Sequence, residues 1–123
     1  MALIPSLEDA SKAAACAQRV VNQAINHSKT ASGTGQHDQA FLYDLSHAAA
    51  ALAMSDTALT YAQQGKEEQR LATIFIGQAI ANLGSSLWQS GERWGQNIDQ
   101  LLPAKEFVAE ATNPELIAEA SDA

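Results

Sequence analysis

The spacing of apolar residues along the chain predicts three long helices. From about residue 6 to residue 29, apolar side chains recur every three or four positions, which is the repeat of one face of an α-helix. The same repeat returns over residues 38–64 and over residues 67–89. The three stripes consist of Leu7, Ala10, Ala14, Ala17, Val21, Ala24 and Ile25, then Phe41, Leu42, Leu45, Ala48, Ala49, Leu52 and Leu59, then Leu71, Ile74, Phe75, Ile80, Leu83, Leu87 and Trp88.

Residues at the ends of these segments are typical of helix termini. Ser6 followed by Asp9 resembles a capping box in which Asp replaces the usual Glu. Residues 30–38 read as a loop, because two Gly stand among Ser and Thr there. Asp38 is suited to cap the second helix, and Gly65 is placed to end it in the left-handed conformation that glycine adopts at little cost.

The third segment contains two glycines that lie seven residues apart on one helix face. Gly77 and Gly84 should each cost about 1 kcal/mol relative to Ala in a helix interior. We interpret them as positions where the backbone of another helix approaches closely. The stretch QSGERWGQ then breaks the pattern, so we expect the helix to end near Gln89.

The remaining chain predicts short helices. NIDQLL is a candidate for a short helix ending at Pro103, and PAKEFVAEA and NPELIAEASDA are acidic helical candidates. Asn113 followed by Pro114 is a typical pair of cap and first-turn residues. We therefore divide the chain into a helical bundle over residues 1–102 and a short acidic helical tail over residues 103–123.

The composition supports an all-α fold. The chain has 123 residues, of which 25 are Ala, 7 are Gly and 3 are Pro, and Ala favours helices most strongly. We predict an antiparallel helical bundle of three long helices with short C-terminal helices. A single chain of this size gives such rods a thin core, so we expect it to form a homo-oligomer, a dimer or a tetramer.

The charge limits the classes of partner. Seven Lys and Arg stand against 14 Asp and Glu, which gives a net charge of −7. This balance disfavours nucleic acid and anionic membrane surfaces as partners. The single cysteine cannot form an internal disulfide, and we find neither a signal peptide nor a membrane-spanning run. We therefore expect a cytoplasmic protein.

Candidate metal ligands and nucleophiles are few. Asp44 and His47 are three residues apart and share a helix face, but di-iron bundles need several Glu and paired Glu-x-x-His motifs that are absent here. Cys16 stands between two alanines, as a small buried apolar residue does. We therefore predict no metal site and no catalytic residue.

Other notable side chains are interpreted as structural. We expect Trp88 and Trp94 to anchor packing near a helix end and Met54 to fill the core. Three carboxylates of the tail have the spacing of a solvated helix face rather than of a catalytic pair. They are Glu106, Glu110 and Glu119.

One stretch resembles a known family. From Ala72 the chain reads ATIFIGQAIANLGSSLWQSGERWG, which is similar to the segment that closes the C-terminal helical domain of acyl-CoA dehydrogenases. That segment ends in a Gln-x-x-Gly-Gly-x-Gly turn, and Gln89 and Gly95 match its first and last positions. DQAFLYDLSHAAAALAMSDTALTYAQQGK and AAACAQRVVNQAINHSKTA resemble the two preceding helices, so the resemblance spans about residues 13–102.

The resemblance implies a fold and a role in oligomerisation. In the family this domain builds the oligomer core and lends one wall to the flavin site. Glu92 and Arg93 replace the paired glycines of the turn, and a carboxylate there would repel the flavin phosphates. The catalytic glutamate segment and the other two family domains have no counterpart here, so no dehydrogenase activity is expected from this chain alone.

Two other interpretations remain open. The chain could be one component of a multi-chain flavoprotein, in which Gln89, Arg93 and Gly95 would face FAD or acyl-CoA and a partner chain would supply the missing domains. Alternatively, it could be an unrelated helical adaptor. If the chain acts in oligomerisation or as an adaptor, we expect the isolated chain to bind no cofactor.

Overall fold

The structure is a computed structural model that describes residues 2–31 and 39–121. Every regular element in these two stretches is a helix, so the all-α prediction is confirmed for the described part of the chain. The predicted cap at Asp38 and almost all of the predicted loop over residues 30–38 lie outside the described residues.

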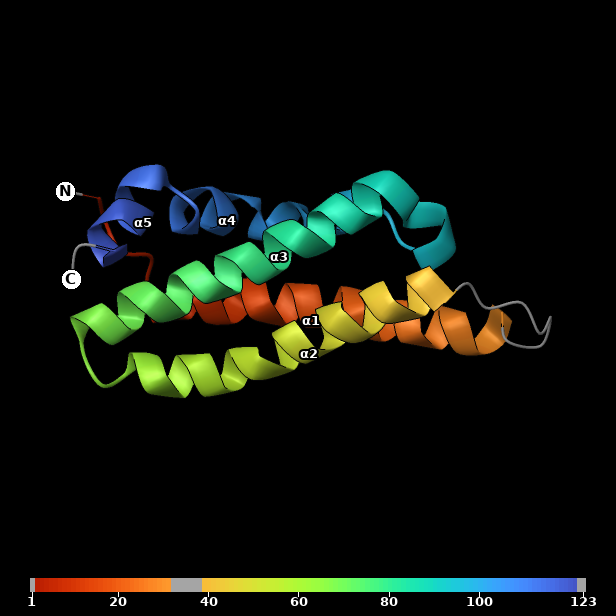
Figure 1. The fold of residues 1–123 in the computed structure, drawn as a ribbon, viewed down its shortest axis with the longest axis horizontal. Coiled ribbons are helices and arrows are strands. Elements are labelled where there is room, and N and C mark those ends of the chain that lie inside the picture. Colours follow the sequence, from red (N-terminus) through yellow and green to blue (C-terminus); the bar gives the residue numbers. More distant parts are fainter. Residues whose placement is uncertain (1, 32–38, 122–123) are drawn as a thin grey trace.

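Three long helices form the body of the molecule, and the rest of the chain returns along them (Figure 1). The long helices run antiparallel to one another in sequence order. Their bounds, followed by those of the 3-10 helix η2 and the two short C-terminal helices, are α1 Leu7–Ala31, α2 Gln39–Ala62, α3 Lys66–Trp94, η2 Ile98–Ala104, α4 Lys105–Ala111 and α5 Pro114–Ser121.

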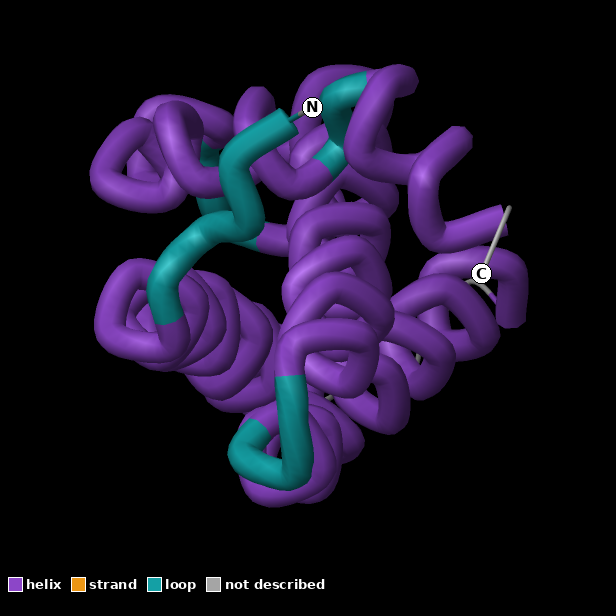
Figure 2. The backbone as a smooth tube through the Cα atoms, turned by 90° about the vertical axis from the view of Figure 1, so that its left-hand side faces the viewer, coloured by secondary structure: helices purple, strands orange, loops and turns teal. Residues whose placement is uncertain are grey.

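Helices α1 and α3 occupy the middle of the bundle. Helix α2 lies along one side, where it packs against α1 and α3, and η2 with α4 covers the opposite side of the same pair (Figure 1). The view along the bundle shows α2 at an outer corner (Figure 2). Helix α2 is therefore an edge helix with a large outward surface.

Small side chains on α1 allow its neighbours to approach closely. Of the predicted stripe on this helix, Leu7 and Ile25 are partly exposed and the others are buried. The buried members are Ala10, Ala14, Ala17, Val21 and Ala24.

Close approach of another helix is confirmed at Gly77, whereas Gly84 contacts only side chains of η2. A Cβ atom added at Gly77 would lie 2.5 Å from the Cβ of Ala111 in α4. One added at Gly84 would lie 3.3 Å from Cδ1 of Ile98 in η2. Gly77 therefore permits a contact that any larger residue would push apart.

The predicted caps are partly confirmed. The Asp9 N–H donates to Oγ of Ser6 at 3.1 Å, and the Glu115 N–H donates to Oδ1 of Asn113 at 2.9 Å. The prediction for Gly65 is wrong, because its φ of 167° is extended backbone. Two turn hydrogen bonds, from the N–H groups of Gln63 and Gln64, close the end of α2 instead.

Helix α3 is longer than the pattern predicted. Ser90 has non-helical angles (φ −142°, ψ 31°), so the helix is interrupted near the predicted end, but it resumes and reaches Trp94. Trp94 is buried and meets Phe41 edge-to-face with ring centroids 5.7 Å apart. Through this aromatic contact the last turn of α3 packs against the start of α2.

The segment that follows residue 102 contributes to the interior of the bundle. Phe107 and Ala111 of α4 and Leu116 of α5 are buried. Helix α4 packs on α1, α3 and η2, and α5 packs on α3. The short acidic segment therefore covers part of the apolar surface of α1 and α3.

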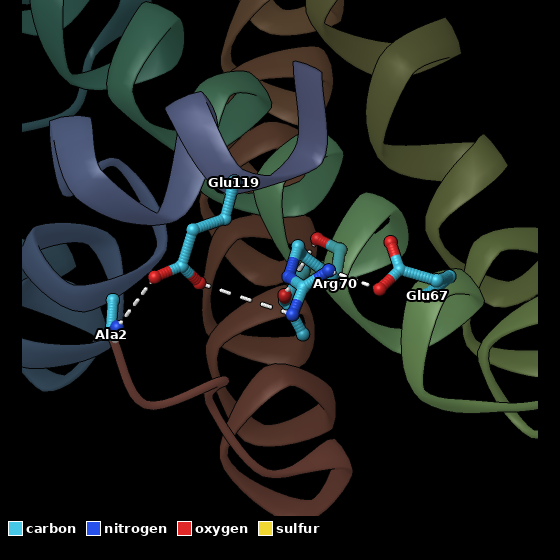
Figure 3. A network of polar contacts seen from close by, with 5 residues as sticks. Ala2, Glu67, Arg70 and Glu119 are labelled. Atoms are coloured by element: carbon cyan, nitrogen blue, oxygen red, sulfur yellow. Dashed lines mark hydrogen bonds and ion pairs between the residues drawn. The ribbon is translucent and has the colours of Figure 1, made fainter. Parts of the chain in front are cut away.

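A polar network joins the two ends of the described chain to α3 (Figure 3). Oε1 of Glu119 accepts a hydrogen bond from the Ala2 N–H at 2.9 Å, and its Oε2 lies 3.9 Å from Nη2 of Arg70. Arg70 also pairs with Glu67, and its side chain is only 11% exposed. The expectation that Glu119 belongs to a solvated face was wrong, because this carboxylate holds α5 against α3.

Two further expectations about large side chains were wrong. Met54 is 54% exposed and Trp88 is 79% exposed, so neither fills the core. Leu71 and Phe75, which the apolar repeat assigned to the buried stripe of α3, are also exposed. The interior uses Ile76 instead, which the repeat had not selected.

Candidate functional site

A groove of about 890 Å³ lies where the end of α3 turns into η2. Gln89, Arg93 and Gly95, the three residues that the family resemblance selected, all line it. Trp88 also lines the groove and leaves most of its surface in solvent. The fold therefore brings the three candidate residues to one place.

The shape of the groove depends on the backbone at Gly95. Its φ of 65° is the one left-handed conformation among the described residues, and it ends α3. The Gln96 N–H donates to the Gly91 carbonyl at 3.2 Å, which closes the turn. A Cβ atom at Gly95 would overlap the imidazole ring of His27 in α1. Conformation and space both require glycine here, and the contact with His27 was not foreseen from the sequence.

Amide side chains form the start of η2 on one side of this groove. Asn97 caps η2 by accepting from the Asp99 N–H at 2.8 Å, and Gln100 accepts from the Asn97 N–H at 2.6 Å. Nε2 of Gln100 also donates to Oε1 of Gln96 at 2.8 Å and to Oε1 of Gln23 at 2.9 Å. These bonds tie α1, η2 and the preceding turn together and use polar groups that would otherwise face a ligand.

The charges of the groove give no preference for an anion. Among its lining residues the charged side chains are Glu92 and Arg93, which are adjacent in sequence and both exposed. A diphosphate near Arg93 would also meet the Glu92 carboxylate, and the opposite charges offset each other. The groove is thus a neutral polar surface with one exposed indole.

The other candidate chemistries do not assemble into a site. Asp44 and His47 are exposed on α2, and the His47 ring lies 4.2 Å from that of Tyr43. Within residues 2–31 and 39–121, no three His, Cys, Asp or Glu side chains are grouped so that they could hold a metal ion. Cys16 is buried, and its Sγ donates to the Gln100 carbonyl at 3.4 Å.

The most unusual surface of the molecule is the outward face of α2. Sixteen of its 24 residues are Ala, Leu, Phe, Met or Tyr, and its charged residues are Asp44 and Asp56. Successive residues turn by about 100° around a helix, so residues spaced three or four apart share a face. One such line is exposed except at Ala58, which is partly buried, and we name it the outer stripe of α2: Tyr43, His47, Ala50, Met54, Ala58 and Tyr61.

The outer stripe is free of charge and opposite to the buried face. Asp44 follows Tyr43 and so lies about 100° away around the helix, while Asp56 lies about 160° away from Met54. Neither acid therefore interrupts the stripe. Its large members are substantially exposed, with Tyr43 at 65%, Met54 at 54% and Tyr61 at 42%.

Helix α3 carries further exposed apolar side chains near the turn that joins it to α2. A groove of about 260 Å³ between the two helices is lined by both apolar and polar residues, which are Asp44, His47, Ala48 and Ala51 of α2 and Ala79, Asn82, Leu83 and Ser86 of α3. Phe75 lies one helical turn from Ala79, and Met54 lies one turn from Ala51. Because α2 and α3 are antiparallel, both steps lead toward the turn that joins the helices (Figure 1). Met54 and Phe75 therefore both lie on the side of this groove that is nearer to the turn.

Comparisons with known proteins give no assignment. No protein-family model, curated protein or solved structure matches the chain. One helix of the described residues, α3, is long and apolar enough to cross a membrane, and half of its apolar window is buried inside the bundle. A central helix of a helical bundle meets the same two criteria, so this property does not assign the chain to a membrane.

Proposed function

We propose that this chain is a non-enzymatic helical module whose main role is to form a homo-oligomer. The observation that carries the proposal is the edge helix α2, which exposes an uncharged apolar face. A helix at the surface of a monomer normally carries polar residues on its outward side. Helix α1 follows this rule, because Glu8, Lys12 and Arg19 lie on it outside the buried face. On α2 the exposed polar residues, among them Asp44 and Asp56, lie beside the outer stripe, and the stripe itself holds no Asp, Glu, Lys or Arg.

Burial of this face would supply the driving force for association. Removal of apolar surface from water is favourable by roughly 25 cal/mol per Å². Contiguous exposed apolar patches on small proteins commonly mark interaction sites. The outer stripe of α2 gains this stabilisation without having to desolvate a carboxylate or a Lys side chain.

The resemblance to acyl-CoA dehydrogenases agrees with this role. The domain that the chain resembles forms the oligomer core in that family, and it does not provide a complete active site. A similar domain that retained the helices and lost the flavin-contacting residues would keep the association function alone. We therefore propose an acyl-CoA dehydrogenase C-terminal-domain-like bundle that is cytoplasmic and not catalytic by itself.

Sedimentation equilibrium of the purified chain over a range of concentrations tests this function. We expect a mass that rises to an even multiple of 13.0 kDa. Two copies of charge −7 repel each other, so added NaCl should screen the repulsion and tighten the association. A 13.0 kDa species at every concentration and ionic strength would exclude the proposed function.

A second candidate function is favoured by the groove at the end of α3. Gln89, Arg93 and Gly95 line it together, as expected for a component of a flavoprotein that completes an FAD or acyl-CoA site. Titration of FAD against the fluorescence of the exposed Trp88 tests it. Saturable quenching that Arg93→Ala weakens would support this candidate, and quenching that is linear in FAD for both proteins would reject it.

A further inference from the structure

We infer that α2 packs antiparallel against α2 of a second copy, about a two-fold axis at the level of residue 52. This inference rests on the proposed function, since it names the surface and the geometry of the self-association. It is carried by the order of large and small residues along the outer stripe of α2.

Two pairs of residues in the outer stripe are symmetric about position 52, whereas His47 would lie at the level of Thr57 of the other copy. Tyr43 and Tyr61 stand at its two ends, and Ala50 and Met54 stand on either side of its centre. Both pairs are centred on position 52. A stripe of this kind is complementary to its own reversed copy, which is the requirement for an isologous interface.

Antiparallel pairing matches a large residue with a small one at the centre. Met54 of one copy would lie opposite Ala50 of the other, and this match occurs twice because of the two-fold axis. Tyr61 would lie opposite Tyr43 at each end, where offset or edge-to-face contacts between aromatic rings are favourable.

Parallel pairing would be poorer in both respects. It would set Met54 against Met54 and Ala50 against Ala50. The two methionines would be crowded, and the two alanines would leave a void. Close packing without voids is what distinguishes specific interfaces. Antiparallel helix dipoles also attract, whereas parallel ones repel.

The charges permit this arrangement. Asp44 would lie at the level of Thr60 of the other copy, and Asp56 at the level of Ala48, so no acid of α2 is placed opposite another. Leu71 and Phe75 near the start of α3 add further exposed apolar surface.

The exposed large side chains set the area that the dimer can bury. A fully exposed large side chain presents about 200 Å². Five of them on this surface are between 39% and 65% exposed, so together they offer roughly 500 Å² per copy. Complete burial of all five on both copies, those of α3 included, would amount to roughly 1,000 Å², which is the lower limit for a biological interface. The five are Tyr43, Met54, Tyr61, Leu71 and Phe75.

A charge placed in the stripe tests the surface. Met54→Glu puts two carboxylates close to the two-fold axis, and we expect at least a hundredfold weaker self-association by sedimentation equilibrium. Trp88→Glu is the matched control, because Trp88 is at least as exposed but lies on α3 at the other groove. The control should associate as the unaltered chain does. Circular dichroism of both variants verifies that the helices are retained.

Distances between spin labels test the geometry without altering the stripe. Ala53→Cys and Thr60→Cys, each in a Cys16→Ala background, place labels on exposed positions of α2 beside the stripe. At 1.5 Å per residue, antiparallel pairing about position 52 separates the Thr60 labels by about 24 Å along the helix axis and the Ala53 labels by about 3 Å. Parallel pairing in register would give equal distances for the two sites.

The outcomes separate this inference from the proposed function. A monomeric unaltered chain would overturn both. An oligomer that Met54→Glu leaves intact would overturn the inference and preserve the proposed function. Loss of association in Met54→Glu with a clearly longer Thr60 distance is the expected result, and equal distances at the two label sites would overturn the two-fold arrangement.

Discussion

Replacement of Gly77 by alanine perturbs the closest helix contact of the bundle. The added Cβ would lie 2.5 Å from the Cβ of Ala111, whereas ordinary contacts between such atoms begin near 3.4 Å. Helices α3 and α4 would have to separate by about 1 Å, and overpacking of this kind costs about 1–3 kcal/mol. The higher helix propensity of alanine stabilises the variant by about 1 kcal/mol and offsets part of this cost. We therefore expect Gly77→Ala to lower the free energy of unfolding by up to about 2 kcal/mol.

Gly84→Ala is the matched control for this substitution. Its Cβ would lie 3.3 Å from Cδ1 of Ile98, which is the end of a flexible side chain. A small adjustment of that side chain relieves the contact, so the propensity of alanine should leave the variant unchanged or up to about 1 kcal/mol more stable. The two glycines occur in the same helix seven residues apart, and only the packing distinguishes them.

Urea unfolding followed by circular dichroism measures both variants. Protein concentrations must be equal, because association adds to the apparent stability. A second substitution, Ala111→Gly, should restore space for the methyl group introduced at position 77, and the double-mutant cycle should show a favourable coupling of about 1–2 kcal/mol. If Gly77→Ala is as stable as the unaltered chain and shows no coupling to Ala111→Gly, the close approach of α4 to α3 is refuted.

Three further substitutions test other parts of the structure by the same unfolding assay. Gly95→Ala should cost about 2 kcal/mol or more, because the residue has positive φ and faces the His27 ring; a loss below about 0.5 kcal/mol would contradict that backbone. Trp94→Leu should cost about 2–4 kcal/mol through the cavity that it leaves beside α2, and an exposed indole would instead tolerate the change. Glu119→Gln should cost about 1 kcal/mol through the weakened tie to Arg70, and the loss should persist at high salt because the Arg70 side chain is largely buried.

The apolar repeat predicted the helices well because helical periodicity is a local property. The segment around Ala14 and Val21 needed only its own spacing to be recognised, and its buried face agrees with that spacing. The repeat could not tell which apolar residues would find a neighbour. Leu71 and Phe75 have the correct spacing for the buried face of α3, yet the fold leaves both exposed.

Helix ends were harder to predict because they depend on contacts between distant segments. Gly65 has the right identity for a left-handed cap, but the turn closes through the two preceding residues. The left-handed glycine is Gly95, where Trp94 packs on Phe41 and His27 fills the space that a side chain would need. His27 and Phe41 belong to other helices and lie far from Gly95 in the sequence, so no local pattern could reveal these contacts.

The candidate site was predicted through the resemblance rather than through chemistry. Gln89, Arg93 and Gly95 do share one groove, but the amides around them are bonded to one another and the charges offset. The sequence analysis did not predict the exposed apolar stripe of α2, although the low charge of this helix can be seen in the sequence. A helix of 24 residues with two charged side chains is unusual for a position at the edge of a bundle.

Native mass spectrometry of the purified chain, with no cofactor added, tests the central claim most directly because it reports subunit number and bound small molecules together. We predict an even-numbered oligomer, foremost a dimer, without any adduct. A monomer would contradict the association module, and a flavin-sized or CoA-sized adduct would contradict its non-enzymatic character and favour the groove at the end of α3.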